Sequence, residues 1–329
     1  MRVICLFLGA LIVASSLYGC AVKSEVKKEA KPVSRPVSVQ LPVQIQSNAR
    51  ITIIPVMLKE NPAENPVSPI VIDQCIMNLA GQIKAKMADN YYQVSLLSYP
   101  VDIGNLALEM MHLSETADYY TLVYVTFLEN NISDAGTAEI KDTPGKSPLT
   151  KKFIVKSQIK TRIEFYDARN YLLLWQTESS SENSMTTGQN ISGTKELDDL
   201  LISLITPNYY KKINDETVNN IAREMFDRIH NFTAVINPDS LVKLNLYLYL
   251  HKPSYTNLVK HEKVTMTNLI SGHEEELETD ASGRIKTTLP EGFYLVEAET
   301  HNPSGKLSGN SKIQTLITGE SRRLNLILK

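Results

Sequence analysis

The spacing of apolar residues divides the chain into a part with mixed patterns and a part with strand patterns alone. Between residues 49 and 236, runs with helical period alternate with period-two or continuously apolar runs. Between residues 240 and 329, only short period-two runs occur. We therefore predict two domains, 49–236 and 240–329. The Asn-Pro-Asp-Ser segment at 237–240 joins them, because the residue before a proline disfavours helix.

The first domain is predicted to begin with a β-α-β-α-β succession. Its strands are expected at 51–56, 92–99 and 119–128, and its helices at about 71–88 and 106–117. Pro55 should end the first strand or place it at a sheet edge. The third strand is almost continuously apolar, as expected of a strand buried on both faces. The apolar side of the first helix includes Cys75, which we interpret as a buried residue and not as a nucleophile.

A polar loop at 130–150 and an antiparallel hairpin follow. The hairpin strands are predicted around 155–165 and 171–177, joined by a turn at 167–170, with Trp175 in the core. One face should be packed by Val155, Ile159, Ile163 and Phe165, and the other should be wet, with Lys156, Gln158, Lys160, Arg162 and Glu164. Two helices are expected at 197–204 and 218–232, the second capped by Asn214 or Asp215. The predicted fold class is α/β, βαβαβ plus an antiparallel hairpin in three layers.

The second domain is predicted to be a small all-β sandwich. Strands are expected at 241–250, 263–268, 276–279, 285–289, 294–299, 313–317 and 323–328. Turns at 280–283 and 290–292 separate them at the spacing typical of such a sandwich.

The first residues have the pattern of an exported lipoprotein. Arg2 precedes an apolar stretch at 3–17 that is shorter than the roughly 20 residues needed to span a bilayer. Leu17-Tyr18-Gly19-Cys20 then resembles the bacterial lipobox, although Tyr18 stands where a small residue is usual. We therefore predict a signal peptide at 1–19 and lipidation of Cys20. An ordinary signal peptide with a chance cysteine is the alternative.

The resemblance to lipoproteins implies a location. Such proteins generally carry three acyl chains of the palmitate type, enough for stable membrane anchoring. Ala21 is not the aspartate that commonly retains such proteins at the inner membrane, which favours the outer membrane, facing the periplasm. Residues 20–48 are rich in proline and lysine and lack glycine, and we predict that they form a flexible, solvated tether. The alternative is that the lysines of this tether contact anionic lipid.

Composition and motifs offer little chemistry. Lys and Arg total 34 against 36 Asp and Glu, and no basic block indicates nucleic acid. No nucleotide-binding or hydrolase motif occurs, so we expect no cofactor, no metal and no catalytic residue. Weaker candidates are set aside as surface or packing residues: His112 with Glu115, the histidines 261, 273 and 301, the acidic run 274–278 as a weak calcium site, and the pairs Tyr91-Tyr92, Tyr119-Tyr120 and Tyr209-Tyr210.

Two stretches resemble known families. The lipid anchor, the βαβαβ body and the hairpin IEFYDARNYLLLWQTES at 163–179 resemble the curli-secretion CsgG and penicillin-binding-protein-activator LpoB lipoproteins, with relatives of the TolB N-terminal fold. TDASGRIKTTLPEGFYLVEAE at 279–299 resembles carboxypeptidase-regulatory-like and PEGA-type modules, which are usually non-catalytic.

These resemblances imply a lipid-anchored scaffold, adaptor or activator of another envelope protein, and not an enzyme. One alternative is a subunit of an outer-membrane secretion assembly. It requires apolar membrane hairpins, whereas the candidate insertions at 130–150 and 180–196 are polar and short. Another alternative is an envelope hydrolase, which catalytic carboxylates converging in one cleft would support.

Lipidation of Cys20 can be tested directly. Replacing the sulfur with Cys20→Ser should leave an uncut precursor that incorporates no radiolabelled fatty acid. A chain that begins at Ile51 should be recovered entirely in the soluble fraction, because lipid is the only predicted attachment. If that truncated chain still sediments with membranes, attachment by lipid alone is wrong.

Overall fold

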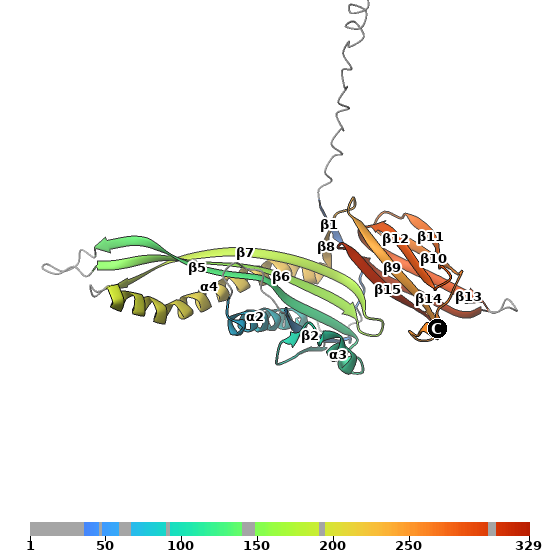
Figure 1. Cartoon of the computed structure of the whole chain (residues 1–329), viewed down its shortest axis with the longest axis horizontal. Coiled ribbons are helices and arrows are strands. Elements are labelled where there is room, and N and C mark those ends of the chain that lie inside the picture. The colour runs from blue at the N-terminus through green and yellow to red at the C-terminus, as the bar shows by residue number, and fades with distance from the viewer. Residues whose placement is uncertain are drawn as a thin grey trace, which may run out of the picture. The chain divides into compact units, whose positions relative to one another are not determined.

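The computed structural model describes residues 36–45, 48–58, 67–89, 93–139, 149–190, 195–301 and 307–329. Outside these residues lie the predicted signal peptide at 1–19, Cys20, the lysines of the predicted tether, Tyr91 and Tyr92. No helix in the described ranges has both the length and the apolar character needed to span a membrane. Residues 36–329 form one compact unit, and Figure 1 shows its elements.

A six-stranded sheet forms the centre of the first domain. Its strands are β2 (Arg50–Met57), β3 (Gln93–Leu96), β4 (Val101–Asp102), β5 (Tyr119–Glu139), β6 (Leu149–Asp167) and β7 (Leu172–Asn190). They run in the order β3-β2-β5-β6-β7, and β4 continues the β3 side of β2. β2 pairs in parallel with β3, β4 and β5, whereas β5, β6 and β7 are antiparallel. The predicted mixture of parallel and hairpin strands is confirmed, although the molecule is mostly sheet.

The prediction that Pro55 ends β2 or places it at a sheet edge is wrong. The strand continues to Met57, and Pro55 pairs with Val123 of β5. On the other side, the carbonyl oxygens of Ile53 and Met57 accept from Leu97 and Ile103. Pro55 therefore faces the gap between β3 and β4, where no amide hydrogen is needed, and the missing donor costs the sheet nothing.

Helices cover both faces of the parallel strands. Helix α2 (Pro69–Ala88) packs Cys75, Ile76, Leu79 and Ile83 against Ile51 and Ile53 on one face, as its periodicity predicted. Helix α3 (Leu106–Leu113) packs against the opposite face, where Ile54, Val56 and Tyr120 lie. Alternate residues of β2 thus enter two separate apolar clusters, because successive side chains of a strand point to opposite faces.

The predicted polar loop at 130–150 and the polar insertion at 180–196 are largely strand. β5 continues to Glu139, β6 begins at Leu149, and β7 extends to Asn190, so the three strands run far beyond the end of β2 (Figure 1). In β7, residues 180–187 are polar at both alternate sets of positions apart from Met185, so the apolar alternation that identifies strands in a sequence is absent there. On β6, by contrast, Phe153 and Val155 are buried.

A single helix replaces the two that were predicted. α4 spans Lys195–Asn231 and contains Pro207, which removes one backbone hydrogen bond without ending the helix. Asn214 and Asp215 are therefore not capping residues. Asn214 Oδ1 accepts a hydrogen bond from Ser157 Oγ at 2.6 Å, and Asp215 Oδ1 accepts one from Asn78 Nδ2 at 2.9 Å. These polar contacts join the middle of α4 to β6 and α2.

Glu164 was predicted on a wet face but is buried. Its carboxylate accepts hydrogen bonds from the hydroxyls of Tyr124 at 3.0 Å and Tyr166 at 3.1 Å, and it forms an ion pair with Arg162 at 3.2 Å. Burial, followed by the nearby Glu164 charge, raises the pKa of both tyrosines. The prediction failed because the Tyr124, Tyr166 and Arg162 side chains surround the carboxylate, which the alternation of apolar and polar residues in the hairpin cannot indicate.

Part of the predicted tether is folded onto the body. β1 (Val37–Gln40) pairs antiparallel with β8 (Thr233–Ile236), which directly follows α4. The Leu41 amide donates to the carbonyl oxygen of Phe232 at 3.1 Å, and the Leu41 side chain is buried. The expected spacer therefore does not extend through residues 36–45. Burial of Leu41 and the β1 pairing fix these residues.

An aromatic cluster connects the hairpin to the end of α4. Trp175 is 1% exposed, which confirms it as a core residue, and its Nε1 donates to the Thr233 carbonyl oxygen at 3.1 Å. The Phe232 ring lies 5.9 Å from Trp175 and 5.4 Å from Phe165, measured between ring centroids. Phe232 has φ of 45°, the left-handed conformation that ends the helix and turns the chain into β8.

The second domain contains two sheets with a common apolar core. One has the order β12-β9-β15, with β12 (Arg284–Pro290), β9 (Leu241–Leu250) and β15 (Ser321–Leu328). The other has the order β11-β10-β13-β14, with β11 (Glu274–Glu278), β10 (Lys263–Asn268), β13 (Gly292–His301) and β14 (Leu307–Ile317). β9 and β10 have the predicted bounds, and the other strands differ by a few residues. Gly283, with φ of 68°, closes the predicted turn after Asp280.

The two predicted domains also contact each other. The segment between them is a turn in which the Ser240 amide donates to the Asn237 carbonyl oxygen. The Thr315 hydroxyl donates to the Leu173 carbonyl oxygen at 3.0 Å, and Phe293 is buried in the apolar cluster of the first domain. Independent folding of residues 240–329 is a prediction of the two-domain division.

Trp175 supplies a test of the aromatic cluster. Trp175→Ala should lower the free energy of unfolding by about 3–5 kcal/mol, because a large buried side chain is replaced by a cavity. Intrinsic fluorescence of the wild type, with its single tryptophan, should be blue-shifted and should move to the red on unfolding. A red emission from the folded protein would contradict the burial.

Candidate interaction surface and cleft

Helix α3 is fixed by its inner side. Met110 is buried, and its carbonyl oxygen accepts a hydrogen bond from the Tyr120 hydroxyl at 2.6 Å. Before the helix, Asp102 Oδ1 accepts from the Gly104 amide at 2.7 Å, which closes the turn that follows β4. The helix is therefore held to the sheet by both its backbone and its apolar inner side.

The outer side of α3 exposes apolar residues. Leu108 is 52% exposed and Met111 is 56% exposed, and these two positions are neighbours on a helix because they are three residues apart. Ile103, in the preceding turn, is 40% exposed. We call Ile103, Leu108 and Met111 the α3 surface. The sequence analysis did not single out these residues, because the helix was predicted from the spacing of other apolar residues, Leu106, Met110, Leu113 and Ala117.

His112 and Glu115 lie at the end of α3 but gain no third ligand. Within the described ranges, no group of three or more His, Cys, Asp or Glu side chains is placed to hold a metal ion. The apolar neighbours Leu108 and Met111 make this region better suited to protein contact than to metal chemistry.

A cleft of about 750 Å³ lies near the end of α4. It is lined by parts of β6, β7, β8 and the turn after β14, together with Pro36. Arg228 of α4 donates to the Glu178 carbonyl oxygen at 2.6 Å and to Thr177 Oγ1 at 3.3 Å, and it forms an ion pair with Glu224. Three glutamates, 178, 224 and 291, share the cleft.

Two of these carboxylates, Glu224 and Glu291, are engaged by other protein groups. Glu224 is engaged by Arg228 and by the Ser179 hydroxyl, which donates to it at 2.6 Å. Glu291 accepts from the Asn237 amide at 3.0 Å, from the Thr318 hydroxyl at 3.0 Å and from the Gly319 amide at 3.1 Å. Glu224 thus joins α4 to β7, and Glu291 fixes the turns between the domains. The cleft therefore gives the hydrolase alternative no pair of free carboxylates.

Cys75 is 4% exposed in α2. Burial, assisted by the charge of Asp215, raises the pKa of its thiol to about 12. Since the thiolate is the reactive form, both protonation and burial oppose nucleophilic chemistry. The structure places this residue where its helical spacing predicted.

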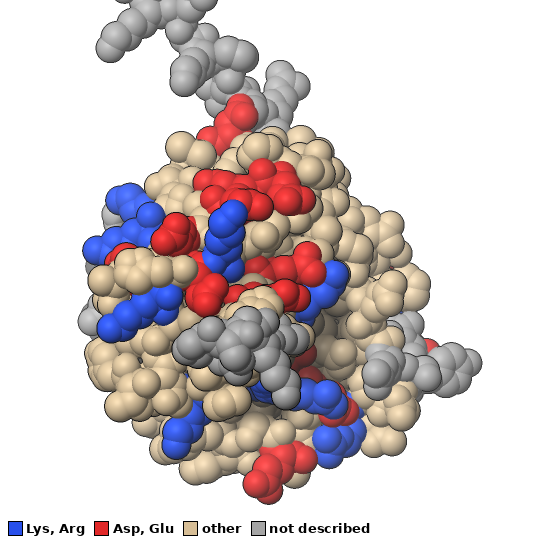
Figure 2. All heavy atoms as spheres, turned by 90° about the vertical axis from the view of Figure 1, so that its right-hand side faces the viewer, with Lys and Arg blue, Asp and Glu red and all other residues tan. Residues whose placement is uncertain are grey.

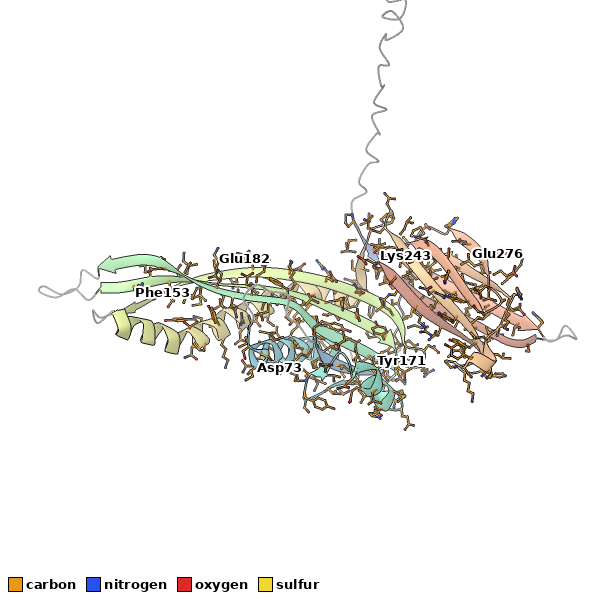
Figure 3. All side chains as sticks on the ribbon, viewed as in Figure 1. Asp73, Phe153, Tyr171, Glu182, Lys243 and Glu276 are labelled. Atoms are coloured by element: carbon orange, nitrogen blue, oxygen red, sulfur yellow. The ribbon has the colours of Figure 1, made fainter. Side chains whose placement is uncertain are left out.

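The remaining candidates are dispersed. Glu276 and Glu278 lie on β11, and Figure 3 labels Glu276. Glu276 Oε2 lies 3.1 Å from Lys263 Nζ, and Glu278 Oε1 lies 3.6 Å from His261 Nδ1. His273 and His301 lie near strand ends of the same sheet. Tyr119 stacks on Phe165 at 5.1 Å and Tyr120 is fully buried, so this pair serves packing. Tyr209 and Tyr210 are half-buried in α4. Cys20 lies outside the described residues.

Comparison with known proteins gives distant similarities only. No family model and no curated protein matches the chain. Lipoprotein GNA1162 from Neisseria meningitidis is 18% identical and covers 49% of this chain and 97% of its own, with a TM-score of 0.23. A minor lipoprotein from Acinetobacter baumannii is 9% identical and covers 58% and 99%, with a TM-score of 0.23. The PelC dodecamer from Paraburkholderia phytofirmans is 9% identical and covers 57% and 94%, with a TM-score of 0.26. TM-scores this far below 0.5 carry no argument about this chain.

The state of Cys75 can be measured in the chain that begins at Ala21, where it is the sole cysteine. Iodoacetamide at about pH 8 should leave it unmodified in the folded protein and should label it fully in denaturant. Because the folded pKa lies above the ordinary value of 9.0, the free energy of unfolding should fall as the pH rises from about 9 towards 12. Rapid labelling of the folded protein would refute the assignment.

Proposed function

We propose that this protein is a non-catalytic, lipid-anchored scaffold or adaptor that binds another protein of the bacterial envelope. The observation that carries the proposal is the α3 surface, where Leu108 and Met111 are more than half exposed on a helix fixed from behind. Exposed apolar groups that lie together are typical of protein interaction sites. The outer membrane, facing the periplasm, is the location favoured by the residues around Cys20.

The rigidity of the helix supports this role. Its inner residue Met110 is buried, and the Tyr120 hydroxyl bonds to the helix backbone. A partner would therefore meet preformed apolar side chains and would not have to order the helix on binding, which lowers the entropic cost of association. The engaged carboxylates of the cleft support the absence of catalysis, since Glu224 and Glu291 already hold protein groups.

Site-specific photocrosslinking in intact cells tests the proposal. A photoreactive amino acid at Met111 should capture a defined envelope protein, whereas the same group at Tyr255, which is 95% exposed on the second domain, should not. Leu108→Ser should reduce the capture from position 111 at least fivefold, with little change in thermal stability, because the side chain is mainly in solvent.

Two results would contradict the proposal. One is equal capture from positions 111 and 255, which would indicate collisions with no defined surface. The other is a hydrolytic activity of the purified protein that Ser179→Ala abolishes, because it would assign function to the cleft.

A further inference from the structure

The outer face of the three-stranded sheet in the second domain is basic and carries tyrosine. On β9, Val242, Leu244 and Leu246 point into the core, so Lys243, Asn245 and Tyr247 point outward. The pairing places Arg284 of β12 beside Tyr247 and Lys286 beside Asn245. On the other side, Arg323 of β15 pairs with Asn245. We call Lys243, Arg284, Lys286, Arg323 and Tyr247 the basic face.

The strands of this face supply positive charge only, although Asp280 in the turn before β12 interacts electrostatically with Arg284. The strands β9, β12 and β15 contain no acidic residue, and the structure describes all of their residues. In the described part of the chain, none of the four basic residues forms an ion pair. The guanidinium groups of Arg323 and Arg284 lie 4.6 and 5.4 Å from the centre of the Tyr247 ring. The arginines are thus held over the sheet by cation–π contacts, and Arg284 also donates from Nη2 to Asn245 Oδ1. Because a guanidinium carries several N–H donors, some are left for an anion.

The opposite sheet has the reverse character. The outward positions of β11 and β13 carry Glu274, Glu276, Glu278, Glu297 and Glu299. Lys263 and Lys312 on this sheet are both consumed in ion pairs, with Glu276 at 3.1 Å and Glu297 at 2.7 Å. Figure 3 labels Lys243 and Glu276 on the two sheets. Figure 2 shows several acidic side chains over the upper part of this end of the molecule, with basic side chains among them and at the left edge. One side of the domain is therefore suited to an anionic surface and the other is not.

The chain enters the body close to the basic face. Pro36 lines the same cleft as Glu291 and Gly319, at the ends of the strands that flank the face. The Lys243 amide donates to the carbonyl oxygen of Glu320, the residue after Gly319. Pro36 lies only 16 positions after Cys20. At the rise per residue of polyproline II, that length of chain spans about 50 Å. A membrane that holds Cys20 would thus lie within reach of this face.

We propose that the basic face binds the anionic headgroups of the membrane surface. Lys and Arg beside an anionic bilayer each contribute attraction that adds over a patch, and tyrosine is favoured at the level of the headgroups. Binding through this face would orient the second domain with the basic face towards the membrane and the acidic sheet away from it. This inference rests on the proposed lipid anchor at Cys20 and adds a second attachment, in place of the expectation that lipid is the only one. It does not depend on the identity of a protein partner.

Vesicle binding by the chain that begins at Ala21 tests the inference without the lipid. It should sediment with vesicles of phosphatidylcholine containing a quarter of phosphatidylglycerol, and not with phosphatidylcholine alone. The double variant Lys243→Gln with Lys286→Gln should bind about 25-fold more weakly, at about fivefold for each basic residue. The matched control Lys263→Gln with Lys312→Gln removes the same net charge from the opposite sheet and should bind like the wild type.

Salt and a competitor complete the experiment. Binding should vanish at about 1 M salt, where charges are screened beyond about 3 Å. Three outcomes overturn the proposal: no binding to anionic vesicles, an equal loss in the control variant, or binding to polyglutamate by the basic face without binding to vesicles. The last outcome would assign the face to an acidic protein. Because the assay contains no protein partner, a failed α3 crosslink would leave its result unchanged.

Discussion

The position of Phe232 between Phe165 and Trp175 is the contact on which the connection of the elements depends. Aromatic pairs of this kind contribute about 0.5–1.5 kcal/mol each beyond the area they bury. The backbone of Phe232 is equally engaged, since its carbonyl oxygen receives the Leu41 amide and its positive φ directs the chain from α4 into β8. A single residue thus brings together the hairpin, the long helix and the first strand. The first strand of the second domain, β9, begins at Leu241, five positions after β8 ends at Ile236.

A second organising contact is polar. Ser157 of β6 meets Asn214 in the middle of α4, and Asn78 of α2 meets Asp215 one position later. Asn130 of β5, whose pairing partner is Ser157, keeps both amide atoms buried without a described partner. Buried polar groups stabilise less than apolar ones but are satisfied in only one alignment. We infer that the Ser157–Asn214 and Asn78–Asp215 hydrogen bonds fix the position of α4 along the long strands. The evenly spaced apolar residues alone would allow several positions.

The sequence was sufficient for elements with a clear apolar period. Helix α2 and strands β9 and β10 were obtained almost to the residue, because a regular face forms wherever such a stripe can be buried. It failed where burial depends on a distant segment. Glu164 is buried because Tyr124 and Tyr166 cover it. Pro55 is tolerated because two short strands leave a gap beside it, and β7 is a strand although residues 180–187 are polar on both faces apart from Met185. The α3 surface was missed because the helix was predicted from its inner stripe, which includes Met110. Leu108 and Met111 lie outside that stripe and are more than half exposed.

The pairing of β1 with β8 has a mechanical consequence. Any pull on the chain before Pro36 reaches the body first through four paired residues and the burial of Leu41. The terminal pair, Val37 with Ile236, bears the load before the aromatic cluster does. A short antiparallel pair has fewer contacts to break than the packed core, so a pull on the chain would detach β1 before it disturbs the other elements of the body.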